Sequence, residues 1–167
     1  MKYKCLVFDH DDTVVNSTAT IHHPCFQLFL EKHIPTAYPG IREIMERQKA
    51  AGGLIAVVSH SYEDNIRRDY AANSLPAPDA VFGWEQPPER RKPDPWPLEE
   101  IMRRFHLQPK ELLMIDDLKP GYDMASACGV DFAAVGWSND IPQIECFLRD
   151  NCSLYFKTVR QLAEYLD

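Results

Sequence analysis

The sequence of 167 residues lacks several features that would each indicate a particular class of protein. No run approaches the roughly 20 apolar residues that a membrane-spanning helix needs. There is no excess of basic charge, because 18 Lys and Arg residues stand against 25 Asp and Glu residues, a net charge of −7. An acidic protein of this kind is a poor general binder of nucleic acid or of anionic membranes. We therefore expect no membrane association and no general nucleic-acid binding.

The cysteines also lack the pattern of a disulfide framework or a zinc site. Their number is odd and no two form a CxxC motif; the positions are Cys5, Cys25, Cys128, Cys146 and Cys152. Free thiols are typical of a reducing compartment. The N-terminal segment MKYKCLVFDH meets an acidic residue too early for a secretory signal. Together these features predict a cytoplasmic protein.

What the sequence does contain is an alternation of short apolar runs and helical patterns. The length fits one domain, and no internal repeat or low-complexity segment interrupts it. The runs predict strands at 3–8, 54–58, 80–82, 112–115, 131–135 and 154–156. The periodicity predicts helices at 17–33, 41–51, 62–72, 97–105, 120–128, 142–148 and 159–166, with an extended proline-rich loop at 87–97. This order is typical of an α/β fold, a three-layer α/β/α Rossmann-like domain around a central, mostly parallel sheet.

Acidic residues follow the first predicted strand at once. Asp9, Asp11 and Asp12 lie within four positions, and burying such a cluster costs several kcal/mol per charge unless a positive group lies among them. The stretch is therefore either a solvated turn or a site built around a cation. Ser59 and the pair Asp116-Asp117 also follow predicted strands, and in parallel sheets ligands bind at the carboxyl ends of the strands. The fold would thus bring these residues to one edge.

Four motifs in order resemble those of the haloacid dehalogenase-like (HAD) superfamily, in its phosphatase branch. They are FDHDDT, the serine that ends LIAVVS, the lysine of RKPDP, and IDDLKPGYDMASACG. The resemblance runs from about residue 3 to residue 137 and is closest to the phosphoglycolate phosphatase and β-phosphoglucomutase type, with little or no cap. The sequence departs from the pattern at Asp12, where glycine is frequent, and at His10. Arg90 and Arg91 adjoin Lys92, so Lys92 is identified by the KPDP context.

The resemblance implies a role for each motif residue. Asp9 would be the nucleophile that forms an aspartyl-phosphate. Asp11 would act first as the general acid and then as the general base. The Ser59 hydroxyl and the His60 backbone N–H would bind phosphate oxygens, and Lys92 would bind the phosphoryl group and Asp9. The acid at Asp11 favours phosphoryl transfer over dehalogenation.

The resemblance also implies Mg²⁺, which prefers oxygen ligands. Asp9 and Asp117 would bind the metal directly, together with the backbone carbonyl of Asp11. Asp116 would bind through water or orient the site. A metal site at His22 and His23 is a weaker interpretation, because adjacent residues point to different sides of a helix.

The interval between the first two motifs bears on the substrate. It has room only for a small helical cap-like insertion at 17–38 within a single HAD-like core domain, 1–167. Such an open site admits a small-molecule or macromolecular phosphate ester, or requires a second subunit to close it, as in a homo-oligomer.

The favoured function is an Mg²⁺-dependent phosphomonoester hydrolase. The alternatives are a phosphotransferase or mutase of the same fold and a non-catalytic, phosphate-binding regulatory module. Trp84, Trp96 and Trp137 are interpreted as packing or loop anchors.

Overall fold

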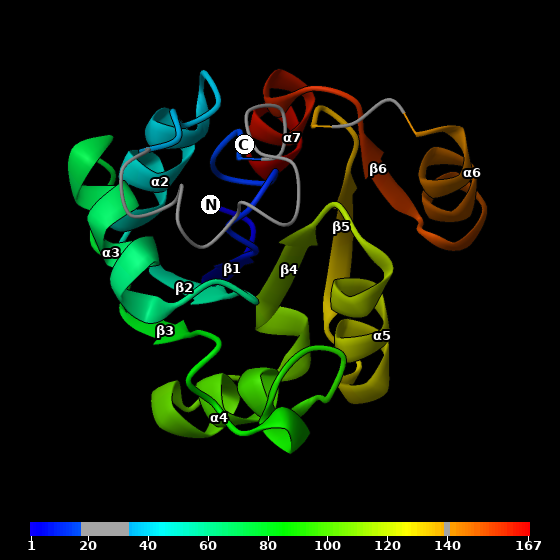
Figure 1. Cartoon of the computed structure of the whole chain (residues 1–167), viewed down its shortest axis with the longest axis horizontal. Helices are drawn as coiled ribbons and strands as arrows, with labels where there is room; N and C mark the ends of the chain where they lie inside the picture. The colour runs from blue at the N-terminus through cyan, green and yellow to red at the C-terminus, as the bar shows by residue number, and fades with distance from the viewer. Residues whose placement is uncertain (18–33, 139–140) are drawn as a thin grey trace.

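The computed structural model describes residues 1–17, 34–138 and 141–167, and all structural statements below refer to these residues. Six strands form one parallel sheet in the order β3-β2-β1-β4-β5-β6 (Figure 1). The strands are β1 (Cys5–Phe8), β2 (Leu54–Val58), β3 (Ala80–Phe82), β4 (Leu112–Asp116), β5 (Asp131–Val135) and β6 (Leu154–Phe156). The chain adds strands outward from β1 on one side and then from β4 on the other. The order therefore reverses between β1 and β4, where α/β sheets place their ligand sites.

Helices cover both faces of this sheet and give the three predicted layers (Figure 1). They are α2 (Ile41–Ala50), α3 (Glu63–Ala72), α4 (Trp96–Phe105), α5 (Lys119–Cys128), α6 (Pro142–Asn151) and α7 (Val159–Leu166), with 3₁₀ turns η2 (Pro88–Arg90) and η3 (Pro109–Glu111). Buried side chains of α2, α3 and α7 form one core cluster with the sheet, and those of α4, α5 and α6 form the other. The α/β/α prediction is confirmed.

The apolar runs of the sequence follow from burial on both faces. In β1, Leu6 and Phe8 belong to the cluster with α2, α3 and α7, whereas Cys5 and Val7 belong to the opposite cluster. All four are fully buried. Successive strand residues point to opposite faces, so a strand covered on both sides must be apolar at every position.

Most predicted bounds agree with the structure to within a few residues, and the proline-rich segment differs most. Residues 87–97 are not one extended loop, because Pro88–Arg90 forms a 3₁₀ turn and α4 begins at Trp96. Prolines fit the first turn of a helix, where the backbone N–H has no intrahelical partner. The prolines next to Trp96 are therefore compatible with a helix that begins at Trp96.

Several expectations concern residues outside the described part of the chain. The helix expected up to residue 33, the pair His22 and His23, and Cys25 fall there. The other four cysteines are free thiols, as predicted. Among the described residues, no helix combines the length and apolar character needed to cross a membrane.

Candidate active site

Three polar groups from distant parts of the chain meet at the carboxyl edge of β1 and β4. Asp9 directly follows β1, and its backbone N–H donates to the carbonyl of Ile115 at 2.9 Å. Lys92, from the loop before α4, donates from Nζ to Asp9 Oδ1 at 2.6 Å and to Asp116 Oδ2 at 2.8 Å. All three side chains are buried. The predicted convergence of Asp9, Lys92 and the acidic pair is therefore observed.

The carboxylates outnumber the cations in this cluster. Oxygens of Asp9, Asp116 and Asp117 all lie within 4.8 Å of one another, and Lys92 pairs with two of these carboxylates, Asp9 and Asp116. Burial, with the neighbouring charges of Asp116 and Asp11, raises the pKa of Asp9 to about 7 although Lys92 opposes the shift. Burial, with the neighbouring charges of Asp116, Asp9 and Asp12, raises the pKa of Asp117 well above its ordinary value. Burial disfavours the ammonium of Lys92, but the two paired carboxylates outweigh it and raise its pKa.

Asp116 and Asp117 differ in what engages their oxygens. Asp116 uses both, because Oδ2 accepts from Lys92 and Oδ1 accepts from the Leu118 backbone N–H at 2.9 Å. The two Asp117 oxygens accept from hydroxyls, Oδ1 from Thr13 at 3.5 Å and Oδ2 from Ser138 at 3.2 Å. Asp116 is thus tied through both oxygens to Lys92 and to a backbone N–H, whereas the contacts of Asp117 include two neutral hydroxyls.

Gly121 permits helix α5 to approach the acidic pair. A Cβ atom at this position would lie 2.2 Å from Asp116 Oδ2. The Asp116 carboxylate is held by its hydrogen bonds, so it could not move away from such an atom without losing them. The sequence analysis assigned no role to Gly121, Thr13 or Ser138. The signal that could have identified Ser138 is its place shortly after β5, at the same edge as the other site residues.

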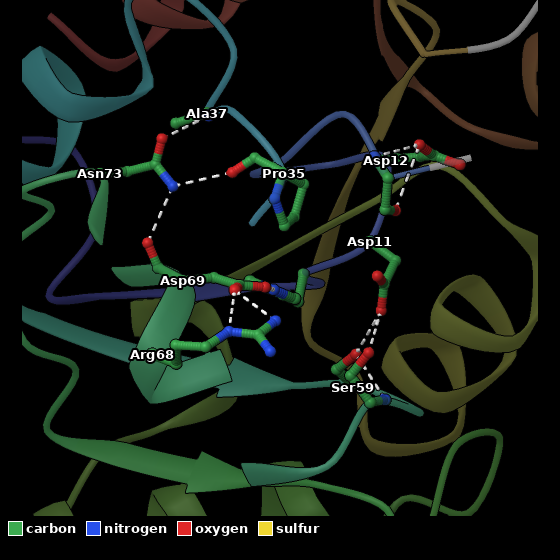
Figure 2. A network of polar contacts seen from close by, with 11 residues as sticks. Asp11, Asp12, Pro35, Ala37, Ser59, Arg68, Asp69 and Asn73 are labelled. Carbon is green, nitrogen blue, oxygen red and sulfur yellow. Dashed lines mark hydrogen bonds and ion pairs between the residues drawn. The ribbon is translucent and has the colours of Figure 1, made fainter. Parts of the chain in front are cut away.

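Asp11 is not one of the three clustered carboxylates, and it faces the turn after β2 (Figure 2). Its Oδ2 accepts from the Ser61 hydroxyl in a short hydrogen bond and from the Ser59 hydroxyl at 3.4 Å. Ser59 also accepts from the Ser61 backbone N–H at 3.1 Å. The structure therefore places Ser59 at the end of β2, as predicted, and adds two contacts that the sequence did not predict, those of Ser59 and of Ser61 with Asp11.

The three basic residues of RRK separate clearly in space. The guanidinium groups of Arg90 and Arg91 lie over the rings of Trp96 and Trp84, at 4.9 and 4.0 Å from the centroids, and only the third basic residue, Lys92, turns inward. His60 forms a hydrogen bond between ring Nε2 and the Lys92 carbonyl at 3.0 Å. This bond joins the turn after β2 to the lysine loop. The choice of Lys92 from the motif context agrees with this geometry.

The tryptophans anchor loops and packing, as expected. Trp96 packs edge-on against Phe82, and the Trp137 indole N–H donates to the Thr13 carbonyl at 3.2 Å. The second contact fastens the loop after β1 to the segment after β5.

His10, unusual in its motif, forms a second buried polar cluster on the other side of the loop. Its Nε2 pairs with Asp69 Oδ2 at 3.0 Å, and the Arg68 guanidinium binds Asp69 Oδ1 at 2.7 Å. The His10 ring stacks on Tyr70. Asn73 continues the network from the Asp69 carbonyl to the backbone of residues 35 and 37 (Figure 2). This cluster ties the acidic loop to α3.

Asp12 stands in a backbone conformation that favours glycine. Its φ is +58°, in the left-handed region where Asp and Asn are the best tolerated of the other residues. Its Oδ1 accepts from the Ser17 backbone N–H at 3.2 Å. Asp12 therefore closes the turn after the DxD motif, which accounts for a residue other than the usual glycine there.

The donor set fits a hard divalent cation. Mg²⁺ is usually held by one or two carboxylates together with phosphate and water oxygens. Asp9, Asp116 and Asp117 supply such oxygens in a buried cluster whose negative charge exceeds that of its lysine. Carboxylates this close together are costly without further positive charge. The residues present thus suit the metal that the motifs imply.

Comparison with known proteins gives the family. Residues 27–135 match the family of haloacid dehalogenase-like hydrolases, and this chain belongs to that family. The matched residues contain Ser59, Lys92, Asp116 and Asp117, while Asp9 and Asp11 precede them. The observed fold and the convergence of these motifs at one sheet edge agree with this membership.

Two curated relatives and a solved structure are similar to the chain. Phosphoglycolate phosphatases of Nitrosospira multiformis and Mesorhizobium japonicum are 30% and 32% identical to it over 115 and 120 residues, covering 66% and 68% of this chain. These matches cover 50% and 53% of the relatives, so the chain spans about half the length of the curated relatives it matches. A D,D-heptose 1,7-bisphosphate phosphatase from B. bronchiseptica, solved with magnesium and phosphate, superposes with a TM-score of 0.71 at 17% identity, covering 98% of this chain and 97% of that one.

Proposed function

We propose that the protein is a Mg²⁺-dependent phosphomonoester hydrolase that works through an aspartyl-phosphate on Asp9. The observation that carries the proposal is the buried contact of Asp9 Oδ1 with Lys92 beside two further carboxylates. A lysine held against the nucleophile places a fixed positive charge where a phosphoryl group would arrive. Asp11, on the same loop, supplies a second carboxyl group that is separate from this cluster.

In the first step Asp9 attacks phosphorus and forms the Asp9 O–P bond. The bond from phosphorus to the leaving oxygen breaks, and the Asp11 carboxyl group gives its proton to that oxygen. Lys92 and the Ser59 hydroxyl bind the nonbridging oxygens, where negative charge gathers in the transition state. The His60 backbone N–H is a further donor in this proposal.

In the second step a water molecule attacks the phosphorus of phospho-Asp9. Its proton passes to Asp11, which acts now as the base, and the Asp9 O–P bond breaks to release phosphate and restore both carboxyl groups. Asp9, Asp117 and the Asp11 carbonyl would hold Mg²⁺, with Asp116 orienting the site, and the bound ion would supply positive charge that lowers the repulsion between the acids and the phosphate dianion.

The relatives support a small phosphate ester as the substrate. Two of them are phosphoglycolate phosphatases, and the heptose bisphosphate phosphatase was solved with magnesium and phosphate. We further propose that residues 1–167 form one core domain in which 17–38 is a small cap-like insertion, so that the site admits esters of different shapes.

The test is hydrolysis of a panel of phosphorylated metabolites and of p-nitrophenyl phosphate with Mg²⁺, by the wild type and by Asp9→Asn. The proposal expects Asp9→Asn to lose about 10³-fold or more in kcat, the scale seen when a nucleophile is removed. Asp123→Asn is the matched control, because Asp123 is a partly exposed residue of α5 that pairs with Lys119. An active Asp9→Asn variant would assign the nucleophile to another residue.

Transfer of the phosphoryl group to an acceptor other than water is the second candidate. Both reactions share the first step, and they differ in the group that attacks phospho-Asp9. Product analysis in the presence of a competing alcohol separates them: hydrolysis gives inorganic phosphate, whereas transfer gives a new phosphate ester. Mg²⁺ binding without turnover on the whole panel would instead favour a regulatory, phosphate-binding module.

A further inference from the structure

Two serines of the turn after β2 contact the same carboxylate, although the motif accounts for only one of them. Ser59 is the motif residue, and Ser61 follows two positions later. Both hydroxyls donate to Asp11 Oδ2, Ser61 by the shorter bond. Both side chains are buried, with 3% and 8% of the residue exposed. A second buried hydroxyl, that of Ser61, therefore lies beside Asp11, the acid of the proposed reaction.

Ser61 does not serve the ordinary purpose of a serine before a helix. Such a serine usually accepts from a free backbone N–H in the first turn. The N-cap of α3 is Tyr62, and no side-chain cap bond forms there. The Glu63 backbone N–H instead binds the carboxylate of Glu85 at 3.0 and 3.1 Å. The Ser61 hydroxyl is thus free of helix capping and directed at Asp11.

The backbone around Ser61 is fixed on two sides. Its N–H donates to the Ser59 hydroxyl at 3.1 Å, and its carbonyl accepts from the Trp84 backbone N–H at 2.9 Å. A hydroxyl whose backbone is held on both sides defines the position of the group that it binds more narrowly than one on a backbone without such contacts.

The contacts also distinguish the two oxygens of Asp11. Both serines bind Oδ2, and no described residue hydrogen-bonds to Oδ1. An acid that must give a proton to a leaving oxygen needs one oxygen held and the other available. When Ser59 turns to a phosphate oxygen, as the proposed function requires, its 3.4 Å contact with Asp11 is the weaker one to give up. The Ser61 bond then holds the carboxyl group alone.

We propose that Ser61 is a positioning residue for Asp11: it holds Oδ2 so that Oδ1 faces the leaving oxygen in the first step and the attacking water in the second. This inference rests on the proposed function and deepens it by dividing the labour between two serines. Ser59 binds the phosphoryl group, and Ser61 orients the acid and base.

A substrate comparison tests this role, because a good leaving group needs little protonation and a poor one needs much. For Ser61→Ala we expect kcat/KM to fall about 10–100-fold with an alkyl phosphate, a part of the 10²–10⁴-fold that a general acid supplies. With p-nitrophenyl phosphate kcat/KM should change less than about 3-fold, while kcat falls because breakdown of phospho-Asp9 still needs the base. Asp11→Asn should show the same pattern more strongly.

Two further variants make the result specific. Ser61→Thr keeps the hydroxyl and should restore most of the alkyl phosphate activity. Ser126→Ala, on the exposed side of α5, is the matched control and should leave both substrates unaffected. Circular dichroism melting of every variant measures folding separately from activity.

The outcomes separate this inference from the function on which it rests. Equal losses on both substrates, or no loss on either, would overturn the role of Ser61 while Asp9→Asn remained inactive and the hydrolase assignment intact. Failure of Ser61→Thr to restore activity while it folds normally would overturn it too. A wild type without turnover, or an active Asp9→Asn, would overturn the proposed function and this inference together.

Discussion

Two adjacent residues after β1 enter two buried polar clusters of opposite character. Asp9 lies with Lys92, Asp116 and Asp117, where carboxylates outnumber the ammonium. His10 lies with Asp69, whose carboxylate also binds the Arg68 guanidinium. Both clusters are buried and both cost desolvation energy. They differ in charge balance, because the His10 cluster pairs its acid with basic groups whereas the Asp9 cluster keeps an excess of acid.

This difference separates a structural network from a candidate site. A cluster whose charges balance holds elements together and needs no ligand. In a cluster with excess negative charge the carboxylates repel one another until a positively charged group binds. If the proposed function holds, the Asp9 cluster lowers the stability of the free protein, and binding of a cation and a phosphate would offset that loss. Substitutions in the His10 cluster should consequently act mainly on stability, whereas substitutions in the Asp9 cluster should act on activity and on the way stability depends on metal and pH.

The largest expected effect on stability is at the balanced cluster. Asp69→Asn weakens the buried acceptor that His10 and the Arg68 guanidinium share and should lower the free energy of unfolding by about 1–3 kcal/mol, the scale for a buried hydrogen bond to a charged group. Urea denaturation measures it, with Asp79→Asn, which pairs with Lys49 on a more exposed surface, as the comparison. An equal, small effect of both variants would contradict a structural role for the His10 cluster.

The next effect should appear in activity. Lys92→Met leaves the three neighbouring carboxylates without their ammonium and should lower kcat about 10²–10³-fold, the scale for loss of one electrostatic donor. Steady-state kinetics on an aryl phosphate measure it, and Lys110→Met, on the turn η3, is the control. A Lys92→Met enzyme with normal kcat would remove Lys92 from the proposed reaction.

A smaller and opposite effect is expected at Asp117. Asp117→Asn reduces the excess charge, so without metal it should raise the free energy of unfolding by about 1 kcal/mol, the usual scale of a single substitution. The same variant should lose the stabilisation that Mg²⁺ gives the wild type, because it lacks one metal ligand. Thermal unfolding with EDTA and with Mg²⁺ measures both. Destabilisation in EDTA would contradict the interpretation of excess charge.

A further effect in the same cluster is the dependence of the free energy of unfolding of the metal-free protein on pH. The pKa of Asp9 rises from about 3.9 in the unfolded chain to about 7 in the folded one, so the folded state binds the proton more tightly. The contribution of this group is complete below about pH 4 and is lost as the pH rises through about 7. Unfolding in EDTA should therefore become easier over this window, and Mg²⁺ should reduce the loss. A flat profile in EDTA would contradict the raised pKa.

The sequence predicts the strands and the position of the Asp9 cluster well, because both follow from the burial of the sheet. Strands buried on both faces must be apolar throughout, and polar residues directly after them must lie at the carboxyl edge, so Asp9, Ser59 and Asp116 are placed by local pattern alone. The approach of α5 through Gly121 depends on a close contact between elements that no local pattern carries.

The balanced cluster could not be predicted in the same way. His10 and Asp69 are 59 positions apart, and the pairing depends on how α3 packs against the loop after β1. Asp69 occurs in a helix with charged residues at many positions, so its burial gives no sequence signal. Ser61 likewise resembles a helix-capping serine until its hydroxyl is seen to bind Asp11.

The most direct test of the account is to trap the phosphoryl group on the protein. The wild type is mixed with an aryl phosphate and Mg²⁺, quenched in acid within milliseconds and digested for mass spectrometry. The account predicts one phosphoryl group on the peptide that contains Asp9, which disappears with EDTA and in Asp9→Asn. Steady turnover with no phosphorylated Asp9, or with the phosphoryl group on another residue, would contradict it.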